Sequence, residues 1–356
     1  EMIWGLISIV WIDNGVFISE QLRKSYFTGA SIRYLVLLLP FAIIYPVVTH
    51  NTILKYKKKK VRTISLNFGK FSIEKVVWYM LIVMLMYLYL DIAISGIPIL
   101  HGNITRGNFY GQYSRLPLAS SLHSQILPFL MLLCGKKIGM NLKHLKKDNL
   151  SIIITILIFI FQICMEYKFY GLYDYVLYFL IPLIVLNYEK IFKKRKLPVK
   201  QLIEALLMVT ILLFVCYKQY SATQINPFQY LLDRMFALHS HTFWGTDLLV
   251  QTKQLGFNVN QMFAEIVAGI KSVSAYDANY GIARIMYKVT ASSYAYDMIS
   301  SGCLFSGSFI TVGISYLGYF LTFILSGIIG VFIGKVSAKL MLYINTGNVI
   351  FIFIIF

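Results

Sequence analysis

The segment NPFQYLLDRMFALHSHTFWG, residues 226–245, opens the long hydrophilic interval of a chain that otherwise consists of apolar runs. Asn is a preferred helix-capping residue, and Pro227 suits the first helical position, where its missing N–H has no intrahelical partner to lose. Apolar residues then recur close to a 3.6-residue period, at Phe228, Leu231, Leu232, Met235 and Phe236. The pattern predicts a helix that starts at Asn226. Continued at that period, it places Tyr230, Arg234 and His241 on one side and His239 nearly opposite.

The composition indicates a membrane protein. The chain has 356 residues, of which 58% are hydrophobic and only 13% are charged, whereas a soluble domain carries about 25% charged residues. Its apolar residues come in runs of about twenty, the length that crosses a bilayer as a helix. We therefore expect an all-α, polytopic bundle of about nine to ten transmembrane spans, which forms one integral membrane domain over residues 1–356.

The basic residues predict an orientation in the membrane. The net charge is +18, and 21 of the 33 Lys and Arg residues lie in four short intervals between apolar runs. Cytoplasmic loops carry such an excess, so the charge calls for no nucleic-acid partner. Alternation then places a smaller loop, 95–118, and a larger loop, 217–302, on the outer face of the membrane, which would be the periplasmic face in a Gram-negative cell. Residues 304–356 are expected to form Gly-rich C-terminal spans, the first of which, 304–334, is long enough to be bent.

The predicted outer face is rich in arginine. Four arginines there interrupt apolar surroundings, namely Arg106, Arg115, Arg234 and Arg284. A guanidinium offers a planar fork that binds phosphate or carboxylate through two hydrogen bonds. The alternative is that they pair with acidic residues of the same long interval, which are Asp233, Asp247, Glu265, Asp277 and Asp297. The sequence leaves both readings open, above all for Arg284.

Two further patterns concern packing. A second helix in the long interval, from about Asn260 to Lys271, has its large apolar residues on one face and is expected to lie on the membrane. Gly330-x-x-x-Gly334, extended back to Ser326, predicts a face that packs closely on another helix. We find no nucleotide-binding, hydrolase or zinc motif, and therefore expect neither a cofactor nor a metal.

An outer-face site restricts the chemistry, because no nucleotide is available there. Arginines, histidines and aromatic residues suit a lipid-linked diphosphate donor, whose bond energy is already stored in the molecule. Transfer from such a donor needs neutralisation of the departing diphosphate and a base for the incoming hydroxyl. Arginine supplies that charge without a metal ion.

The chain resembles the oligosaccharide repeat-unit polymerases of bacterial surface polysaccharide, the O-antigen or capsule polymerases. The likeness lies in the layout of spans with two arginine-bearing outer loops, in the Gly-rich stretch LFSGSFITVGISYLGYF (304–320), and in RMFALHSHTFWG (234–245). In the last segment an Arg starts an aromatic-rich helix and Gly245 follows after ten intervening residues. The smaller loop departs from the pattern, because neither Arg106 nor Arg115 is followed by Gly at that offset.

The resemblance implies glycosyl transfer between undecaprenyl-diphosphate-linked oligosaccharides, with membrane lipid, a flippase and a chain-length regulator as partners. We assign binding of the donor diphosphate to Arg234. The base is His241, or His239 if the helix ends early. Binding of the second diphosphate falls to Arg106, Arg115 and Arg284, while Tyr230 and Trp244 pack against sugar or prenyl.

Other functions remain as alternatives. A flippase for lipid-linked oligosaccharide would share the arginines but would place them within spans and show repeated halves, which we do not find. An O-antigen ligase performs the same chemistry on a different acceptor and is poorly separated by sequence. A membrane acyltransferase would need a histidine within a span facing a cytoplasmic donor. A purely structural protein leaves the long outer interval unexplained.

Overall fold

The structure is a computed structural model that describes most of the chain. The described residues are 2–18, 29–58, 67–68, 71–101, 104, 109–144, 149–166, 175–188, 226–271, 273–274, 276–300, 304–305 and 307–346, with eight single positions between 203 and 217. They are helical apart from loops and a two-stranded ribbon, β1 (Asn67–Phe68) and β2 (Phe71–Ser72), which confirms the all-α prediction. Among them, three helices are long and apolar enough to cross a membrane: Ala30–Tyr56, Lys75–Leu100 and Phe309–Ile344. The larger number of spans stays a prediction.

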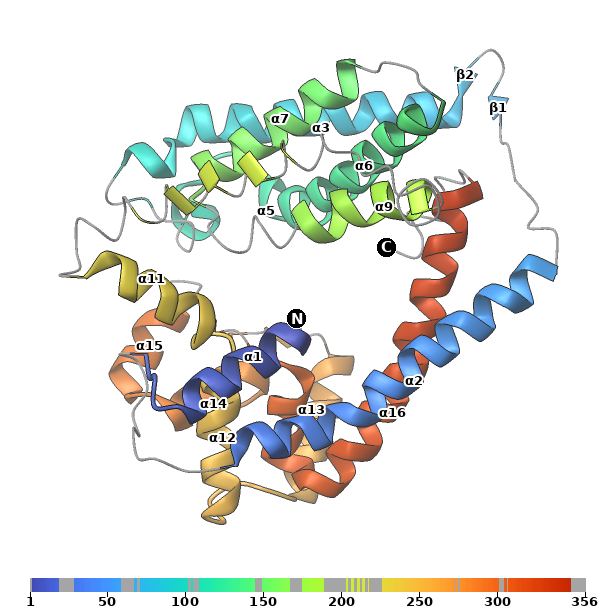
Figure 1. The fold of residues 1–356 in the computed structure, drawn as a ribbon. Coiled ribbons are helices and arrows are strands. Elements are labelled where there is room, and N and C mark those ends of the chain that lie inside the picture. The colour runs from blue at the N-terminus through green and yellow to red at the C-terminus, as the bar shows by residue number, and fades with distance from the viewer. Residues whose placement is uncertain are drawn as a thin grey trace. The chain divides into compact units, whose positions relative to one another are not determined.

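The chain folds as two compact units, the first made of Glu1–Asn51 and Tyr220–Lys335. Its helices are α1 (Met2–Asp13), most of α2 (Ala30–Lys58), α11 (Pro227–Phe236), α12 (His241–Gln251), α13 (Val259–Ile270), α14 (Gly281–Val289), α15 (Ser292–Ser300) and most of α16 (Phe309–Thr346) (Figure 1). The long interval is thus a set of helices that folds together with two of the three long apolar helices.

The second unit comprises Thr52–Gln219 and Val336–Phe356. It contains α3 (Ile73–Ser95), the short α5 (Ala119–Ser121), α6 (Leu127–His144), α7 (Asn149–Cys164) and α9 (Ile181–Tyr188). Between them lie a 3-10 turn, Pro98–Leu100, and three π-helical turns, Phe109–Tyr113, Leu122–Ile126 and Tyr175–Leu180. The core is apolar and includes Leu85, Phe129 and Phe161.

Helix α6 continues beyond its apolar run into a Lys-rich stretch and ends at His144. Gly135 and Gly139 lie one turn apart on α6, where a methyl group on either would press against the backbone of Phe179 or Leu183. Asn187 of α9 donates to the carbonyl of Gly139 at 3.0 Å. The two glycines therefore act as a close-packing face, which holds this part of the chain in a helix.

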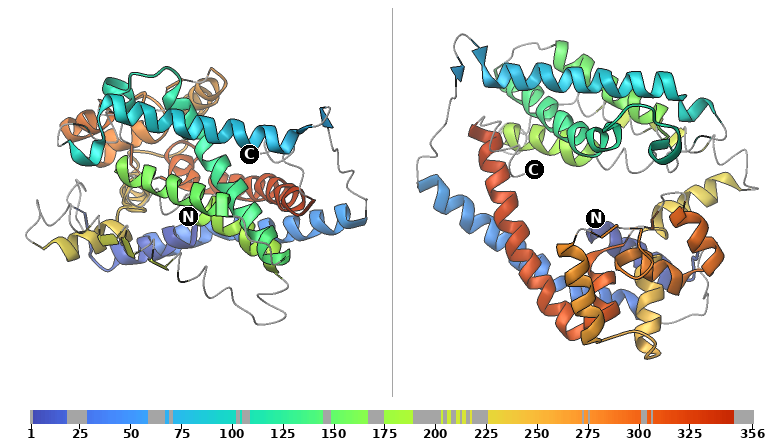
Figure 2. Two further views of the ribbon diagram at one scale, coloured as in Figure 1. Left: turned by 90° about the horizontal axis from the view of Figure 1, so that it is seen from above. Right: turned by 180° about the vertical axis from the view of Figure 1, so that it is seen from behind.

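In the first unit, α2 and α16 lie side by side (Figure 2). A methyl group added to Gly330 would lie 3.3 Å from the Cα of Phe41, and one on Gly334 would lie 3.0 Å from the carbonyl oxygen of Tyr45. Ser326 is fully buried on the same helix. The predicted close-packing face is confirmed, and α2 is the helix that it packs against.

Helix α16 is bent at Gly318, as the length of its apolar run allowed. Gly318 has φ 69° and ψ −174°, a conformation that is essentially restricted to glycine. The bend frees backbone carbonyls of the preceding turn from their helical partners. A loop before α13 satisfies two of them, since the N–H of Asn258 donates to Tyr316 at 2.8 Å and that of Gly256 to Ser315 at 3.4 Å.

Candidate functional site

The predicted helix start is confirmed, but the helix is shorter than expected. The side chain of Asn226 accepts a hydrogen bond from the N–H of Gln229 at 3.2 Å, and Pro227 is the first residue of α11. Helix α11 ends at Phe236, and a turn separates it from α12. In that turn the N–H of Ser240 donates to Ser8 Oγ at 3.0 Å, and its hydroxyl donates to the carbonyl oxygen of Gly5 at 2.8 Å. These bonds to α1 favour the turn, so the helical period does not continue to His241, and the alternative in which the helix ends early is the one found.

Helix α11 is attached to α1 by aromatic stacking. The ring of Phe236 lies 5.1 Å from that of Trp4 and 5.0 Å from that of Trp11, nearly parallel to both. Arg234 is two residues earlier, in the last turn of α11. Its side chain lies outside the described part of the structure, whereas Tyr230, one turn before it, is half-buried. The stacking therefore fixes the helical segment that contains Arg234.

The two histidines and Trp244 occupy different environments. His241 is 1% exposed, with Nδ1 2.7 Å from the carbonyl oxygen of Leu238 and its ring 4.6 Å from that of Phe305. Trp244 is also 1% exposed and meets Phe17 edge to face. Both belong to α12, whose first nine residues are buried. The structure thus places Trp244 in the protein core. The expectation that Trp244 packs against sugar or prenyl is therefore wrong. His239, in the turn, is half-buried.

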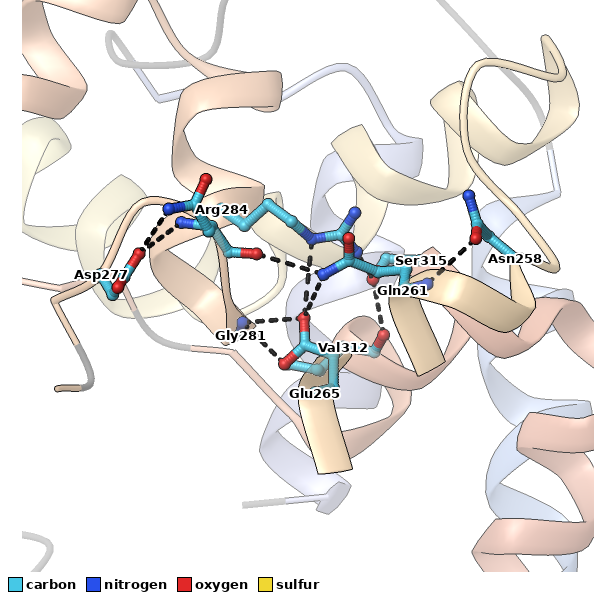
Figure 3. Close-up of polar contacts among 9 residues, drawn as sticks. Asn258, Gln261, Glu265, Asp277, Gly281, Arg284, Val312 and Ser315 are labelled. Carbon is cyan, nitrogen blue, oxygen red and sulfur yellow. Dashed lines mark hydrogen bonds and ion pairs between the residues drawn. The ribbon is translucent and has the colours of Figure 1, made fainter. Parts of the chain in front are cut away.

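Arg284 is held between α13 and α16 (Figure 3). Its Nη2 donates to the hydroxyl of Ser315 at 2.6 Å, and its Nε lies 3.7 Å from Oε1 of Glu265. The carboxylate of Glu265 also accepts hydrogen bonds from the N–H of Gly281 and from the side chain of Gln261. The pairing alternative left open by the sequence is therefore the one found for Arg284.

The charge on Arg284 is costly to bury but remains in place. Burial lowers the pKa of its guanidinium, and the negative charge of Glu265 opposes that shift. An arginine stays protonated over the physiological range even so. Its Nε is buried and makes no hydrogen bond among the described residues, because the carboxylate is too distant. The site thus contains a cation whose hydrogen-bonding capacity is only partly used.

A second charged cluster of the first unit was not predicted. Arg33 of α2 makes a bidentate pair with Asp247 of α12, with Nε 2.9 Å from Oδ1 and Nη2 on Oδ2. The hydroxyl of Tyr319 donates to the same carboxylate at 2.8 Å, and Gln251 donates to that hydroxyl. The carboxylate is fully buried, whereas the Arg33 side chain is 26% exposed. The available signal was an arginine at the start of an apolar run, where charges are rare unless they have a role.

The second unit contains Arg115, and α3 fixes its position. Asp91 is 1% exposed, and its carboxylate accepts hydrogen bonds from the hydroxyls of Ser95 and Ser114 and from the N–H groups of Arg115 and Leu116, at 2.8–3.2 Å. The Arg115 side chain is exposed. A buried carboxylate thus orders the loop that presents an arginine to its surroundings. Arg106 lies outside the described residues.

Known proteins provide no guide to this site. No protein-family model, no curated protein and no solved structure matches the chain. Among the residues that the structure describes, no group of three or more His, Cys, Asp or Glu side chains is placed to hold a metal ion. The chemistry must therefore be argued from the arginines and their partners. Of the predicted site residues, the first unit contains Tyr230, Arg234, His239, His241, Trp244 and Arg284, and the second contains Arg115.

Proposed function

We propose that the chain is a bacterial inner-membrane polymerase of surface polysaccharide, which transfers a growing glycan from undecaprenyl diphosphate to a lipid-linked repeat unit. In this reaction the acceptor hydroxyl attacks the anomeric carbon of the donor. The bond from that carbon to the diphosphate breaks, and undecaprenyl diphosphate leaves. The protein must neutralise the departing charge and accept the hydroxyl proton.

One observation carries the proposal. The arginine-bearing interval folds as helices α11–α15 in the same compact unit as most of α2 and most of α16. Both of these helices are long and apolar enough to cross a membrane. A site in such a unit would meet lipid-linked substrates at the membrane surface, where their diphosphates lie. The resemblance of residues 234–245 to the repeat-unit polymerases supplies the reaction class.

The structure refines the proposed roles. We propose His239 as the base if the helix ends early. Because α11 ends at Phe236 and His239 is more exposed than His241, His239 is the preferred candidate. Arg234 is proposed to bind the donor diphosphate. Arg115, whose backbone Asp91 fixes, is proposed to bind the second. Arg284 already pairs with Glu265 and donates a hydrogen bond to Ser315. A supporting electrostatic role therefore suits it better than direct bidentate binding of a diphosphate.

The test is the banding of lipopolysaccharide from cells that lack the gene and are complemented with wild type or Arg234→Ala. We expect loss of the polymer ladder, with a single repeat unit still attached to the core. Core without any repeat unit would indicate a flippase or a ligase instead, and a normal ladder would remove the protein from this pathway.

A charge-conserving variant separates binding from folding. Loss of one charged hydrogen-bonded contact costs about 1.5–3 kcal/mol, which is roughly ten- to 150-fold in rate. We expect Arg234→Ala to lose activity by that factor and Arg234→Lys to recover only part of it, because lysine cannot make the bidentate contact. Full activity in both variants would refute the role of Arg234.

A further inference from the structure

Helix α13 exposes a continuous apolar face. Phe263 is 58% exposed and Ile270 is 79% exposed, and they lie on one side of the helix with the exposed side chains of Val259, Ile266 and Val267. The opposite side carries Gln261, Glu265 and the buried Ala268. The surfaces of soluble proteins seldom carry so many large apolar side chains in one stripe. The apolar face of α13 is therefore a contact surface.

The orientation of α13 is fixed from its polar side (Figure 3). Asn258 caps its first turn by accepting from the N–H of Gln261 at 3.0 Å. Glu265 accepts from Gly281 and pairs with Arg284, while Gln261 also donates to the carbonyl of Asn279 at 3.1 Å. Rotation of the helix to hide its apolar face would break all of these contacts. The apolar face therefore needs a partner outside this unit.

The apolar face continues onto a long apolar helix. Phe257, which is 61% exposed, lies against Gly318 of α16, with its N–H nitrogen 3.6 Å from the position of a Cβ there. Beyond Gly318, α16 exposes Phe320 and Ile328 among other large apolar side chains. Helix α16 is long and apolar enough to cross a bilayer, so one hydrophobic medium can cover both surfaces.

The charges at the ends of α13 also fit a lipid surface. Lys253 and Lys271 precede and follow the helix, and both are exposed. The one acidic residue of α13, Glu265, is turned inward to Arg284. An apolar stripe flanked by lysines is the pattern of a helix that lies in the membrane interface beside anionic headgroups.

We propose that α13 lies in the plane of the membrane interface, with Phe257 and its apolar face inserted among the acyl chains of the bilayer that α2 and α16 cross. The occupant of this surface is lipid. The placement also sets the depth of Arg284. Since a helix with its side chains is about 10 Å across, a group on the far side of α13 lies at the level of the lipid phosphates. The inference stands independently of the reaction that the protein catalyses.

Site-specific photo-crosslinking tests the placement in the full chain, reconstituted in vesicles of phosphatidylethanolamine and phosphatidylglycerol. p-Benzoyl-phenylalanine replaces Phe263 or Ile270, and a matched control replaces Lys288, an exposed position of α14. After irradiation, we expect mass spectrometry to find lipid adducts at positions 263 and 270 and none at position 288.

Two outcomes would overturn the proposal. Cross-links to a second copy of the chain at 263 and 270 would show a protein interface, and the absence of any adduct there would show a surface that faces water. Because Ile270 is the more exposed of the two positions, the probe at 270 should leave packing intact and keeps the test decisive if the variant at 263 fails to fold.

Discussion

Replacement of Arg33 by Met tests whether the Arg33–Asp247 pair holds the first unit together. The variant keeps an apolar stem of similar length and removes the guanidinium. Asp247 then remains fully buried, with the hydroxyl of Tyr319 as its hydrogen-bond donor among the contacts described above. Removal of one partner of a buried ion pair destabilises a protein by about 3–5 kcal/mol. The remaining bond from Tyr319 places the expected loss near the lower limit, at about 3 kcal/mol.

The opposite substitution should cost less, and this asymmetry comes from burial. In Asp247→Asn the charge left behind is on Arg33, whose side chain is 26% exposed and can be partly solvated. Exposed pairs contribute about 0–1 kcal/mol, so we expect a loss of about 1–2 kcal/mol when this partly exposed charge is left unpaired. At about 2 °C per kcal/mol, the two variants should lower the unfolding midpoint by about 6 °C and about 3 °C.

Thermal unfolding of the purified protein in detergent measures both shifts. Arg115→Met is the matched control, because the Arg115 side chain is exposed; we expect no shift from it. The double variant Arg33→Met, Asp247→Leu should recover much of the loss, since apolar replacement of a buried pair is often near neutral. The reasoning fails if Arg33→Met shifts the midpoint no more than the control, or if Asp247→Asn is the more damaging change.

Two further predictions concern packing and the ordered loop. Gly330→Val should destabilise the α2–α16 contact by about 1–3 kcal/mol, because even a Cβ there would lie 3.3 Å from the Cα of Phe41. Gly269→Val on α13 is the control, because a Cβ at Gly269 would meet no atom within 4 Å. Equal midpoints for the two variants in thermal unfolding would contradict this. Asp91→Ala should speed tryptic cleavage after Arg115, because the loop loses the three hydrogen bonds that Ser114, Arg115 and Leu116 donate to the carboxylate. Asp297→Ala, at an exposed position, should leave the rate unchanged. An unchanged rate for Asp91→Ala would show that the carboxylate does not order the loop.

Features that depend on neighbouring residues could be predicted from the sequence. The Asn226 cap, the helix beginning near Asn260 and the small residues around Gly330 each require only a pattern within a few turns. The helical class follows for the same reason, because a long apolar run leaves the backbone few other ways to satisfy its hydrogen bonds. The identity of α2 as the partner of Gly330 required the structure.

Features set by distant residues could not be predicted. The turn before His241 depends on bonds from Ser240 to Ser8 and Gly5, more than 200 positions earlier. A local 3.6-residue period contains no information about such distant partners. It therefore could not show that the helix ends before His241. Arg33 is 214 positions from Asp247, and its role was missed for the same reason. For Arg284 the sequence supplied the correct partner among several, but could not choose between Glu265 and a ligand.

The bend of α16 connects the two charged clusters of the first unit. Ser315, which accepts from Arg284, and Tyr319, which donates to Asp247, are four residues apart. In a continuous helix such residues share one face, but Gly318 stands between them in a conformation that only glycine adopts readily. The bend therefore directs two neighbouring side chains to different arginines, Arg284 and, through Asp247, Arg33. A single glycine in the Gly-rich tail thus contributes to the arginine environment of the long interval, which explains why a site proposed in residues 217–302 also depends on residues beyond 304.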